Sequence, residues 1–231
     1  MRVGEVFSTA FSTFGARARV LVPIAFCASL VVSVVSRVLG ESVVGVLVGL
    51  VIDMAFFTFV VAVAMVVLRD LRERRPDSSA SELLASALPP LPAATLAALL
   101  ALVGLIAGTL LLIVPALYLM TIWAVLLPVL VVERQDVFDA FGRSQDLVRG
   151  NGWKVFGVVL LLGLILVGIS FPLALALQRQ VEGEVAHVLV GSLVSSFITP
   201  FEALVLGVLY YRLRELEGQE PAPSGQDSVL E

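Results

Sequence analysis

The feature that most limits how this chain can fold is a run of 42 residues, from Leu91 to Val132, that contains no charged side chain. As one straight helix the run would be about 63 Å long at about 1.5 Å per residue, twice the roughly 30 Å thickness of a bilayer's hydrocarbon core. Gly108 and Pro115 lie near the middle of the run, where they favour a turn. The run therefore predicts two membrane-spanning helices that form a tight hairpin.

Four more apolar runs are long enough to cross a bilayer, so the sequence predicts an all-α polytopic membrane protein with six spans. The composition agrees, because 59% of the 231 residues are hydrophobic and only 15% are charged. A soluble domain has about 25% charged residues. We expect one integral membrane domain over residues 1–217 and a disordered acidic tail over residues 218–231. The predicted spans cover residues 20–39, 43–68, 91–111, 115–132, 153–177 and 185–209.

Basic residues are concentrated in alternate connections between these spans. Thirteen of the 15 lysines and arginines lie before span one, after span two, between spans four and five, or after span six. Only Arg37 and Arg179 lie in the other connections. Because positively charged loops stay in the cytoplasm, this pattern predicts a multi-pass protein of the cell membrane with both termini in the cytoplasm.

An amphipathic segment precedes the first span of each predicted hairpin. In residues 3–14 and again in residues 137–148, apolar side chains recur at helical spacing opposite polar ones. Between these segments, Ser79 and Glu82 form an S-x-x-E capping box that starts a shorter helix. The chain is thus predicted to contain three quasi-repeats, each a cytoplasmic interfacial helix followed by a hairpin. The side chains expected in the headgroup region are Phe7, Phe11, Phe138 and Phe141.

Three polar residues inside the apolar runs form a candidate intramembrane site: Asp53 in span two, and Thr199 and Glu202 in span six. A charged carboxylate costs about 3 kcal/mol at the centre of a bilayer, so each acid needs a partner or a proton. Two roles fit this pattern, a structural carboxyl that is protonated or hydrogen-bonded inside the bundle and an ion or proton relay. Pro200 is expected to interrupt its helix, as in transporters.

Two G-x-x-x-G pairs predict close helix packing, Gly45 with Gly49 and Gly104 with Gly108. One histidine and one cysteine leave few ligands for a metal, and we expect no metal site, no cofactor and no catalytic residue. The net charge of -4 offers no concentrated basic face to nucleic acid. The expected partners are the lipid bilayer and a membrane protein, which includes a second copy of this chain.

Several short motifs follow one another along the second half of the chain. They are Val114-Pro115-Ala116-Leu117-Tyr118-Leu119, Trp123, Pro128, Ala140-Phe141-Gly142-Arg143-Ser144 and Leu209-Tyr210-Tyr211-Arg212-Leu213-Arg214. In this order they resemble the membrane-domain family of glycerophosphoryl diester phosphodiesterases and its stand-alone relatives, over most of residues 91–217. The resemblance implies a six-span prokaryotic membrane protein, in some relatives fused to a soluble enzyme that acts on glycerophosphodiesters. It transfers no catalytic residue to this chain.

Three functions from different classes are compatible with these observations. The first is a non-enzymatic scaffold or accessory protein that acts on lipids or on a membrane partner, and it ranks first because it needs no reactive group. The second is a small-solute or lipid transporter that uses Asp53 and the span with Pro200. The third is a membrane-embedded lipid hydrolase, which needs a nucleophile beside a base or a metal site. A cavity shared by Asp53 and Glu202 would favour the transporter.

Overall fold

The computed structural model describes residues 2–40, 42–73, 80–180 and 183–218, and their regular structure is entirely helical. The helices are α1 Val3–Leu39, α2 Val43–Glu73, α3 Ala80–Ala87, α4 Leu91–Leu111, α5 Ile113–Ile122, α6 Leu126–Glu133, α7 Val137–Val148, α8 Gly152–Gln180 and α9 Glu184–Glu217. Six stretches are long and apolar enough to cross a membrane, and α5 with α6 forms the fourth of them. The prediction of an all-α polytopic membrane protein is confirmed.

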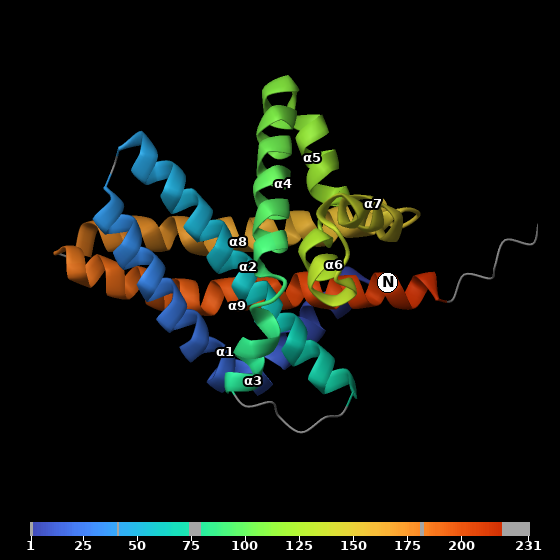
Figure 1. The fold of residues 1–231 in the computed structure, drawn as a ribbon, viewed down its shortest axis with the longest axis horizontal. Coiled ribbons are helices and arrows are strands. Elements are labelled where there is room, and N and C mark those ends of the chain that lie inside the picture. Colours follow the sequence, from blue (N-terminus) through green and yellow to red (C-terminus); the bar gives the residue numbers. More distant parts are fainter. Residues whose placement is uncertain (1, 41, 74–79, 181–182, 219–231) are drawn as a thin grey trace, which may run out of the picture.

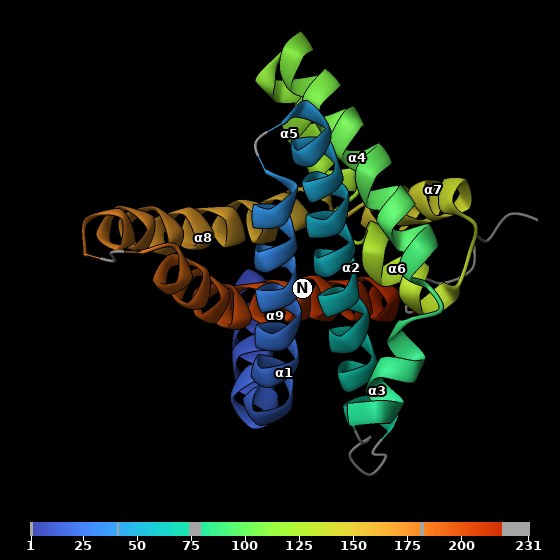
Figure 2. The ribbon, with the colours of Figure 1, turned by 60° about the vertical axis from the view of Figure 1, so that its left-hand side comes forward.

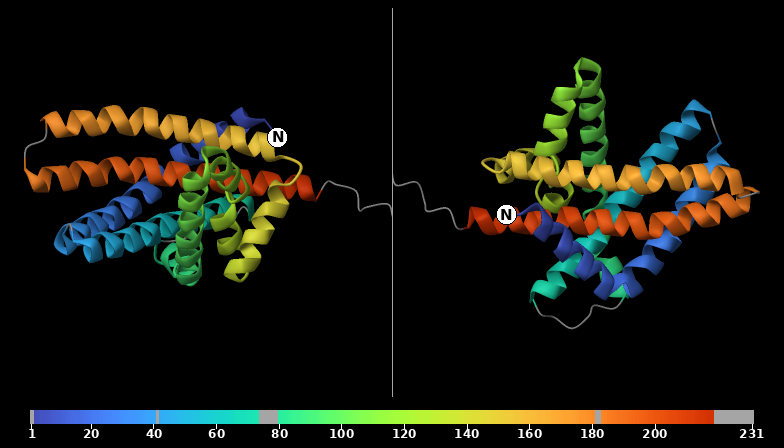
Figure 3. Two further views of the ribbon diagram at one scale, coloured as in Figure 1. Left: turned by 90° about the horizontal axis from the view of Figure 1, so that it is seen from above. Right: turned by 180° about the vertical axis from the view of Figure 1, so that it is seen from behind.

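Three helical hairpins radiate from a common base. Hairpin 1 consists of α1 and α2, hairpin 2 of α4 and α5, and hairpin 3 of α8 and α9 (Figure 1). We call their closed ends the tips, and Figure 2 shows the tip of hairpin 3 turned away from the other two. The tips also remain apart when the molecule is seen from above and from behind (Figure 3). The helices therefore diverge toward the tips and do not form one parallel bundle.

The largest part of the hydrophobic core lies at the base, where the hairpins meet, and we call this part the hub. It is formed mainly by residues 60–68 of α2, residues 203–213 of α9 and residues 125–130 in and just before α6. Toward the tips the apolar side chains lose their protein neighbours, and Val38 and Leu110 are each 83% exposed. Exposed apolar side chains on long helices are what a lipid environment allows.

Helices α2 and α9 approach each other closely in the hub at Gly207, a position that the sequence did not single out. A Cβ atom at Gly207 would lie 2.5 Å from Leu68 Cδ1 and 2.8 Å from Met65 Sδ. Only glycine therefore fits between these two side chains as they stand.

The first helix differs from the prediction, which separated an interfacial helix at residues 3–14 from a span at residues 20–39. One helix covers both segments. The residues between them, Ala16 to Arg19, alternate alanine with arginine, and both are strong helix formers. Figures 1 and 3 nevertheless show that α1 bends strongly after its dark-blue first part, so this part runs in a different direction from the rest.

The first part of α1 packs against hairpin 3. Val6 and Ala10 are fully buried. The Phe14 ring meets the rings of Phe197 and Phe201 edge to face, with centroid distances of 6.5 and 6.2 Å. Much of the apolar face that was predicted to enter the headgroup region is therefore covered by protein.

The turn of hairpin 2 lies within the predicted segment between Gly108 and Pro115. Helix α4 ends at Leu111 as predicted, and Leu112 is extended with a φ of -177°. Helix α5 then begins at Ile113, two residues earlier than predicted. Pro115 lies in the first turn of α5, where a backbone N–H has no helical acceptor, so the proline costs no hydrogen bond.

The predicted fourth span, residues 115–132, is not one helix, because α5 ends at Ile122 and α6 begins at Leu126. Pro128 has no N–H to donate to the carbonyl four residues earlier, which weakens a continuous helix here. In the break, the Leu126 N–H donates to the Trp123 carbonyl at 3.1 Å. Ser144 Oγ of α7 donates to the Ile122 carbonyl at 2.8 Å. This bond gives a donor to a carbonyl at the C-terminal end of α5 that has no partner within the helix.

The predicted interruption at Pro200 is absent, since α9 continues through this residue. Proline removes one backbone hydrogen bond, but helices in membrane proteins tolerate it where neighbouring helices support them. Pro200 is buried, and the following residues Ala203 and Leu204 are fully buried in the hub. Packing against the neighbouring helices therefore maintains α9.

Two further predictions concern the ends of described segments. The capping box begins at Ser79, which lies outside the described residues, while α3 itself is present and buries Leu83 and Ala87. The predicted acidic tail lies outside the described residues from position 219 onward.

Candidate functional site

Charged and polar side chains at the base join α2, α6, α7 and α9 in a network that we call the charged belt. Its members are Arg72 of α2, Glu133 of α6, Arg143 of α7, and Tyr210, Glu215 and Glu217 of α9. Arg143 Nε donates to Glu133 at 3.0 Å, and its terminal nitrogens donate to both Glu217 oxygens at 2.5 and 2.7 Å. The hydrogen bonds to Glu217 and Glu133 outweigh the effect of burial and raise the pKa of Arg143 above its ordinary value.

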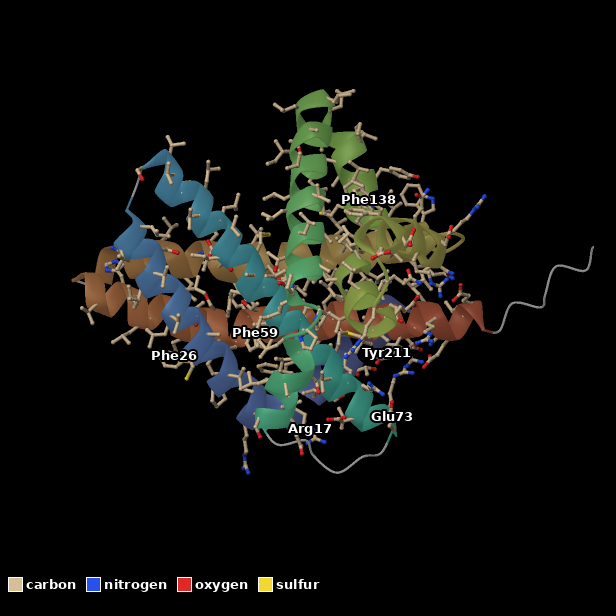
Figure 4. All side chains as sticks on the ribbon, viewed as in Figure 1. Arg17, Phe26, Phe59, Glu73, Phe138 and Tyr211 are labelled. Atoms are coloured by element: carbon tan, nitrogen blue, oxygen red, sulfur yellow. The ribbon has the colours of Figure 1, made fainter. Side chains whose placement is uncertain are left out.

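The rest of the charged belt fixes α9 to α2 and α6. Tyr210 Oη donates to Glu133 Oε1 at 2.8 Å. Arg72 donates to Glu215 at 2.5 Å, and its guanidinium carbon lies 4.2 Å from the ring centroid of Tyr211. Figure 4 shows charged side chains gathered around these helix ends, while the tips are mostly hydrocarbon. The belt is thus a structural clasp at the base.

Asp53 lines a cavity of about 690 Å³ between α1, α2 and α9, which we call the polar cavity. Its polar walls are supplied by Ser33, Ser36, Arg37, Asp53 and His187. The Asp53 side chain is exposed in this cavity and is not enclosed by the bundle, as a structural carboxyl was expected to be. The candidate site predicted from the sequence did not include Arg37 and His187. Ser29, Ser33 and Ser36 nevertheless form a polar face of α1 that is visible in the sequence.

Glu202 lies in a different place, on a largely apolar cavity of about 340 Å³ that is lined by α2, α4, α5, α6, α8 and α9. Met54, the neighbour of Asp53, lines that cavity, so consecutive residues of α2 face two separate spaces. Thr199 lines neither of them. The three residues predicted as one intramembrane site therefore do not form one site.

A third space is a groove of about 660 Å³ between α5 and α8, which we call the α5–α8 groove. Apolar walls come from Val114, Leu117 and Tyr118 of α5 and from Trp153 and Phe156 of α8. Its end at the base carries Asn151 and Lys154, with Lys154 Nζ donating to Asn151 Oδ1 at 3.0 Å. The groove thus changes from polar at the base to apolar toward the tip of hairpin 2.

The turn from α7 to α8 builds the polar end of the groove. Gly150 has a φ of 82°, which favours glycine and lets α7 stop. Asn151 then accepts the first backbone hydrogen bonds of α8, from Lys154 at 2.9 Å and Val155 at 3.0 Å. The following Trp153 is left 88% exposed at the rim.

The four phenylalanines predicted to lie in the headgroup region divide into two pairs. Phe7 and Phe141 are partly buried against the core, and the Phe141 ring lies 5.0 Å from that of Trp123. Phe11 and Phe138 are 70% and 80% exposed, and Figure 4 labels Phe138 on α7. Of these four phenylalanines, each amphipathic segment therefore directs one toward the protein and one away from it.

The four glycines predicted to pack helices lie in hairpins 1 and 2. An added Cβ would lie 2.5 Å from the Leu39 and Gly40 carbonyls at Gly45, 3.8 Å from Ser36 Oγ at Gly49, 2.7 Å from the Trp123 ring at Gly104, and 3.2 Å from Ala116 Cα at Gly108. These contacts all join the two arms of one hairpin, so the glycines serve packing within the chain.

Within the described ranges, no group of three or more His, Cys, Asp or Glu residues is placed to hold a metal ion. The arrangement that remains is an all-α polytopic membrane protein with a charged clasp at its base and cavities between its hairpins. Within this class, the chain belongs to the family described as a domain of unknown function, DUF8558, whose model matches residues 83–215, more than half of the chain. No curated protein and no solved structure matches this chain.

The matched residues include the whole lining of one cavity and only part of the lining of another. The residues that line the α5–α8 groove, from Val114 to Phe156, all fall inside it. Helices α1 and α2, which supply Arg37 and Asp53 to the polar cavity, fall outside it. The groove is thus a feature of the family region, whereas the polar cavity also depends on hairpin 1.

Proposed function

We propose that this protein is a non-enzymatic accessory protein that binds a phospholipid of the cytoplasmic leaflet in the α5–α8 groove. The observation that carries the proposal is the direction in which the groove changes polarity, with Lys154 and Asn151 at the base and Val114 and Leu117 toward the tip. A phospholipid has the same order of chemistry along its length. The groove volume lies in the range of about 300–1,000 Å³ that is typical of ligand sites.

The sequence supports an orientation in which this lipid belongs to the cytoplasmic leaflet. Basic residues are concentrated at the base of the hairpins, and by the positive-inside rule this supports a base and termini in the cytoplasm and six spans in the cell membrane. Exposed Trp153, Phe11 and Phe138 then lie at the depth of the headgroups, where amphipathic and aromatic side chains are enriched. The bent first part of α1 and α7 would rest on this surface.

The charge at the rim favours an anionic headgroup. Lys154 lies on the rim itself, and exposed Arg149 precedes it by five residues. Each basic side chain near a membrane surface contributes about 1 kcal/mol of attraction to anionic lipid. The resemblance to the membrane domain of glycerophosphoryl diester phosphodiesterases favours related chemistry, because a glycerophosphodiester is a glycerophospholipid without its acyl chains.

Tryptophan fluorescence tests the proposal, because the chain contains only two tryptophans. The protein is reconstituted with phospholipid that carries bromine on its acyl chains, either phosphatidylglycerol or phosphatidylcholine, at equal mole fraction. Quenching that disappears in Trp153→Phe reports acyl chains at the groove. We expect this component to be larger with brominated phosphatidylglycerol than with brominated phosphatidylcholine.

One lysine variant and one arginine control complete the experiment. Lys154→Gln should remove the preference for phosphatidylglycerol, since the variant lacks the charge at the rim. Arg19→Gln serves as the matched control, because Arg19 is also an exposed basic residue near the base but lies outside the groove. Equal quenching by both lipids in the unmodified protein, or equal effects of the two substitutions, would contradict the proposal.

A further inference from the structure

The largely apolar cavity that Glu202 lines, which we call the apolar cavity, is shared by all three hairpins. Its walls include Met54 and Phe57 of hairpin 1, one face of α4 in hairpin 2, and Glu202 of hairpin 3. Leu126 and Leu127 line it as well and belong to the hub. The apolar cavity therefore lies directly beside the hub, where the hairpins converge.

Glu202 is the ionisable side chain among the described residues that line this cavity. The other lining residues are alanine, glycine, valine, leucine, methionine, phenylalanine and tryptophan. Glu202 is partly buried. Within the described ranges, no hydrogen bond and no ion pair joins it to another residue. A carboxyl group in such surroundings needs either a proton or a cationic partner.

The arginines that pair with other acids of α9 do not serve Glu202. Arg72 pairs with Glu215, and Arg143 pairs with Glu217. Glu202 precedes Glu215 by 13 residues, which is about 20 Å along the helix axis at about 1.5 Å per residue. The charged belt therefore offers no partner at the depth of Glu202.

The lining of the apolar cavity also limits the kind of cation that it can accept. A primary ammonium group has three N–H donors, and a donor that finds no acceptor in an apolar space costs about 1–3 kcal/mol. A quaternary ammonium group has no N–H and therefore leaves no donor unsatisfied. Its alkyl groups are compatible with the leucine, valine and alanine side chains of the walls.

Aromatic rings in the walls favour the same class of cation. Phe57 and Trp123 both line the cavity, and the face of an aromatic ring attracts cations. The Trp123 ring is fixed in place, because it lies edge to face with Phe141 at a centroid distance of 5.0 Å and contacts α4 at Gly104. The volume of about 340 Å³ is near the lower end of the range of about 300–1,000 Å³ for ligand sites, which favours a small ligand.

We propose that the apolar cavity binds a small quaternary ammonium cation with apolar substituents, whose charge lies against Glu202 and whose alkyl groups contact Phe57 and Trp123. The cation supplies the partner that Glu202 needs, and the walls replace the water around its alkyl groups. No described lining residue is shared with the α5–α8 groove, so this site is independent of the proposed lipid site.

Equilibrium dialysis of radiolabelled tetraethylammonium against the purified full-length protein tests the proposal. The protein is kept in a non-ionic detergent, and detergent without protein measures partition of the probe into micelles. We expect saturable binding above this blank. Ethylammonium, added as a competitor, should bind at least about tenfold more weakly, because it keeps the charge but has N–H donors and less apolar surface.

The role of the carboxylate is tested by Glu202→Gln. This variant keeps the shape of the side chain and removes its charge, so the dissociation constant of tetraethylammonium should rise at least about tenfold. Asp53→Asn is the matched control, because Asp53 is also an acid within a predicted span but lines the polar cavity. It should leave the dissociation constant unchanged. An unchanged elution profile in size-exclusion chromatography shows that each variant is folded.

A second pair of variants tests the location of the site without changing any charge. Gly163 of α8 lines the apolar cavity, and an added Cβ there meets no atom within 4 Å. Gly163→Leu should therefore occupy part of the cavity and weaken binding at least about tenfold. Gly168→Leu is the control on the same helix, because Gly168 has equally open surroundings and lies outside the lining of the cavity. It should have no effect on binding.

Four results would overturn the proposal. They are the absence of saturable binding above the detergent blank, competition by ethylammonium as strong as by unlabelled tetraethylammonium, unchanged binding by Glu202→Gln, and unchanged binding by Gly163→Leu. Weaker binding by Asp53→Asn than by Glu202→Gln would also overturn it, because the cation would then occupy the polar cavity.

Discussion

Ser144 is a single residue on which the connection between α7 and the broken fourth span depends. Its hydroxyl donates to the Ile122 carbonyl, and the side chain is fully buried. Ser144→Ala leaves that carbonyl without its donor, which costs about 1–3 kcal/mol for a buried group. We expect the apparent melting temperature of the purified protein in mild detergent to fall by several degrees.

The control for this substitution is Ser12→Ala. Ser12 also donates to a backbone carbonyl, that of Thr9 at 2.9 Å, but it is exposed and the bond stays within one helix. Its loss should change stability by less than about 0.5 kcal/mol. If Ser12→Ala and Ser144→Ala lower the melting temperature equally, the contact between α7 and α5 does not stabilise the fold.

At the residue scale, the sequence identifies isolated anomalies but not their surroundings. Asp53 stands out because a carboxylate in a valine-rich helix is recognisable from its own neighbours in the chain. Arg37 and His187 reach the same cavity only because α1, α2 and α9 pack around it. No periodicity within one helix encodes that packing. The same limit explains why Asp53 and Glu202 were grouped, although α2 directs Asp53 and Met54 to two different cavities.

At the scale of a helix pair, Gly104 is a position where added volume should be harmful. Its missing Cβ would lie 2.7 Å from two ring atoms of Trp123, and the Trp123 ring is itself held against Phe141. A rigid ring held in this way cannot move aside easily. We expect Gly104→Ala to destabilise the protein by about 1–3 kcal/mol, measured as a lower thermal midpoint in detergent.

Gly168 provides a control position where the same substitution should not lower the thermal midpoint. It lies inside α8, and an added Cβ there meets no atom within 4 Å. Gly168→Ala should therefore leave stability unchanged or raise it by about 0.5–1 kcal/mol, the usual gain from alanine in a helix. Equal increases of the midpoint for Gly104→Ala and Gly168→Ala would show that helix propensity, and not contact with Trp123, governs these positions.

The helices themselves are largely predictable, because long apolar runs have few alternatives in a membrane. The predicted end of the third span coincides with the end of α4 at Leu111. The predicted helix breaks are wrong where the effect of a proline was judged without the residues that pack around it. Pro200 leaves α9 intact, whereas the chain breaks just before Pro128, where Ser144 of a later helix is available to satisfy the freed carbonyl. The sequence alone does not say which proline has such a partner.

For the whole molecule, the alternation of basic connections predicts that the base faces the cytoplasm. In a Cys27→Ala background, a membrane-impermeant maleimide should label Ser42→Cys, at the tip of hairpin 1, in intact cells. Arg149→Cys, at the base, should be labelled only after the cells are opened. Both positions are exposed in the structure. Labelling of Arg149→Cys in intact cells would reverse the orientation, and labelling of neither position would contradict the accessibility of the tip.

The overall shape is the part that could not be predicted. Hydropathy identifies three hairpins, but their directions depend on contacts between helices that are not neighbours in sequence, such as α1 with α9 and α2 with α4. Toward the tips the apolar side chains lose their protein neighbours, so the tips diverge and leave the spaces described above. Sequence periodicity marks which face of a helix is apolar but not which helix covers it.

The packing of α1 against α9 also has a consequence for how the protein is made. Helix α1 leaves the ribosome well before α9, yet Ser29 of α1 donates a hydrogen bond to the Ser192 carbonyl of α9, and the Phe14 ring meets the Phe201 ring edge to face. During translation hairpin 1 must therefore wait in the membrane with this face uncovered. The hub closes only after α9 has been inserted, so the decisive folding step comes after hairpins 1 and 2 are already in the membrane.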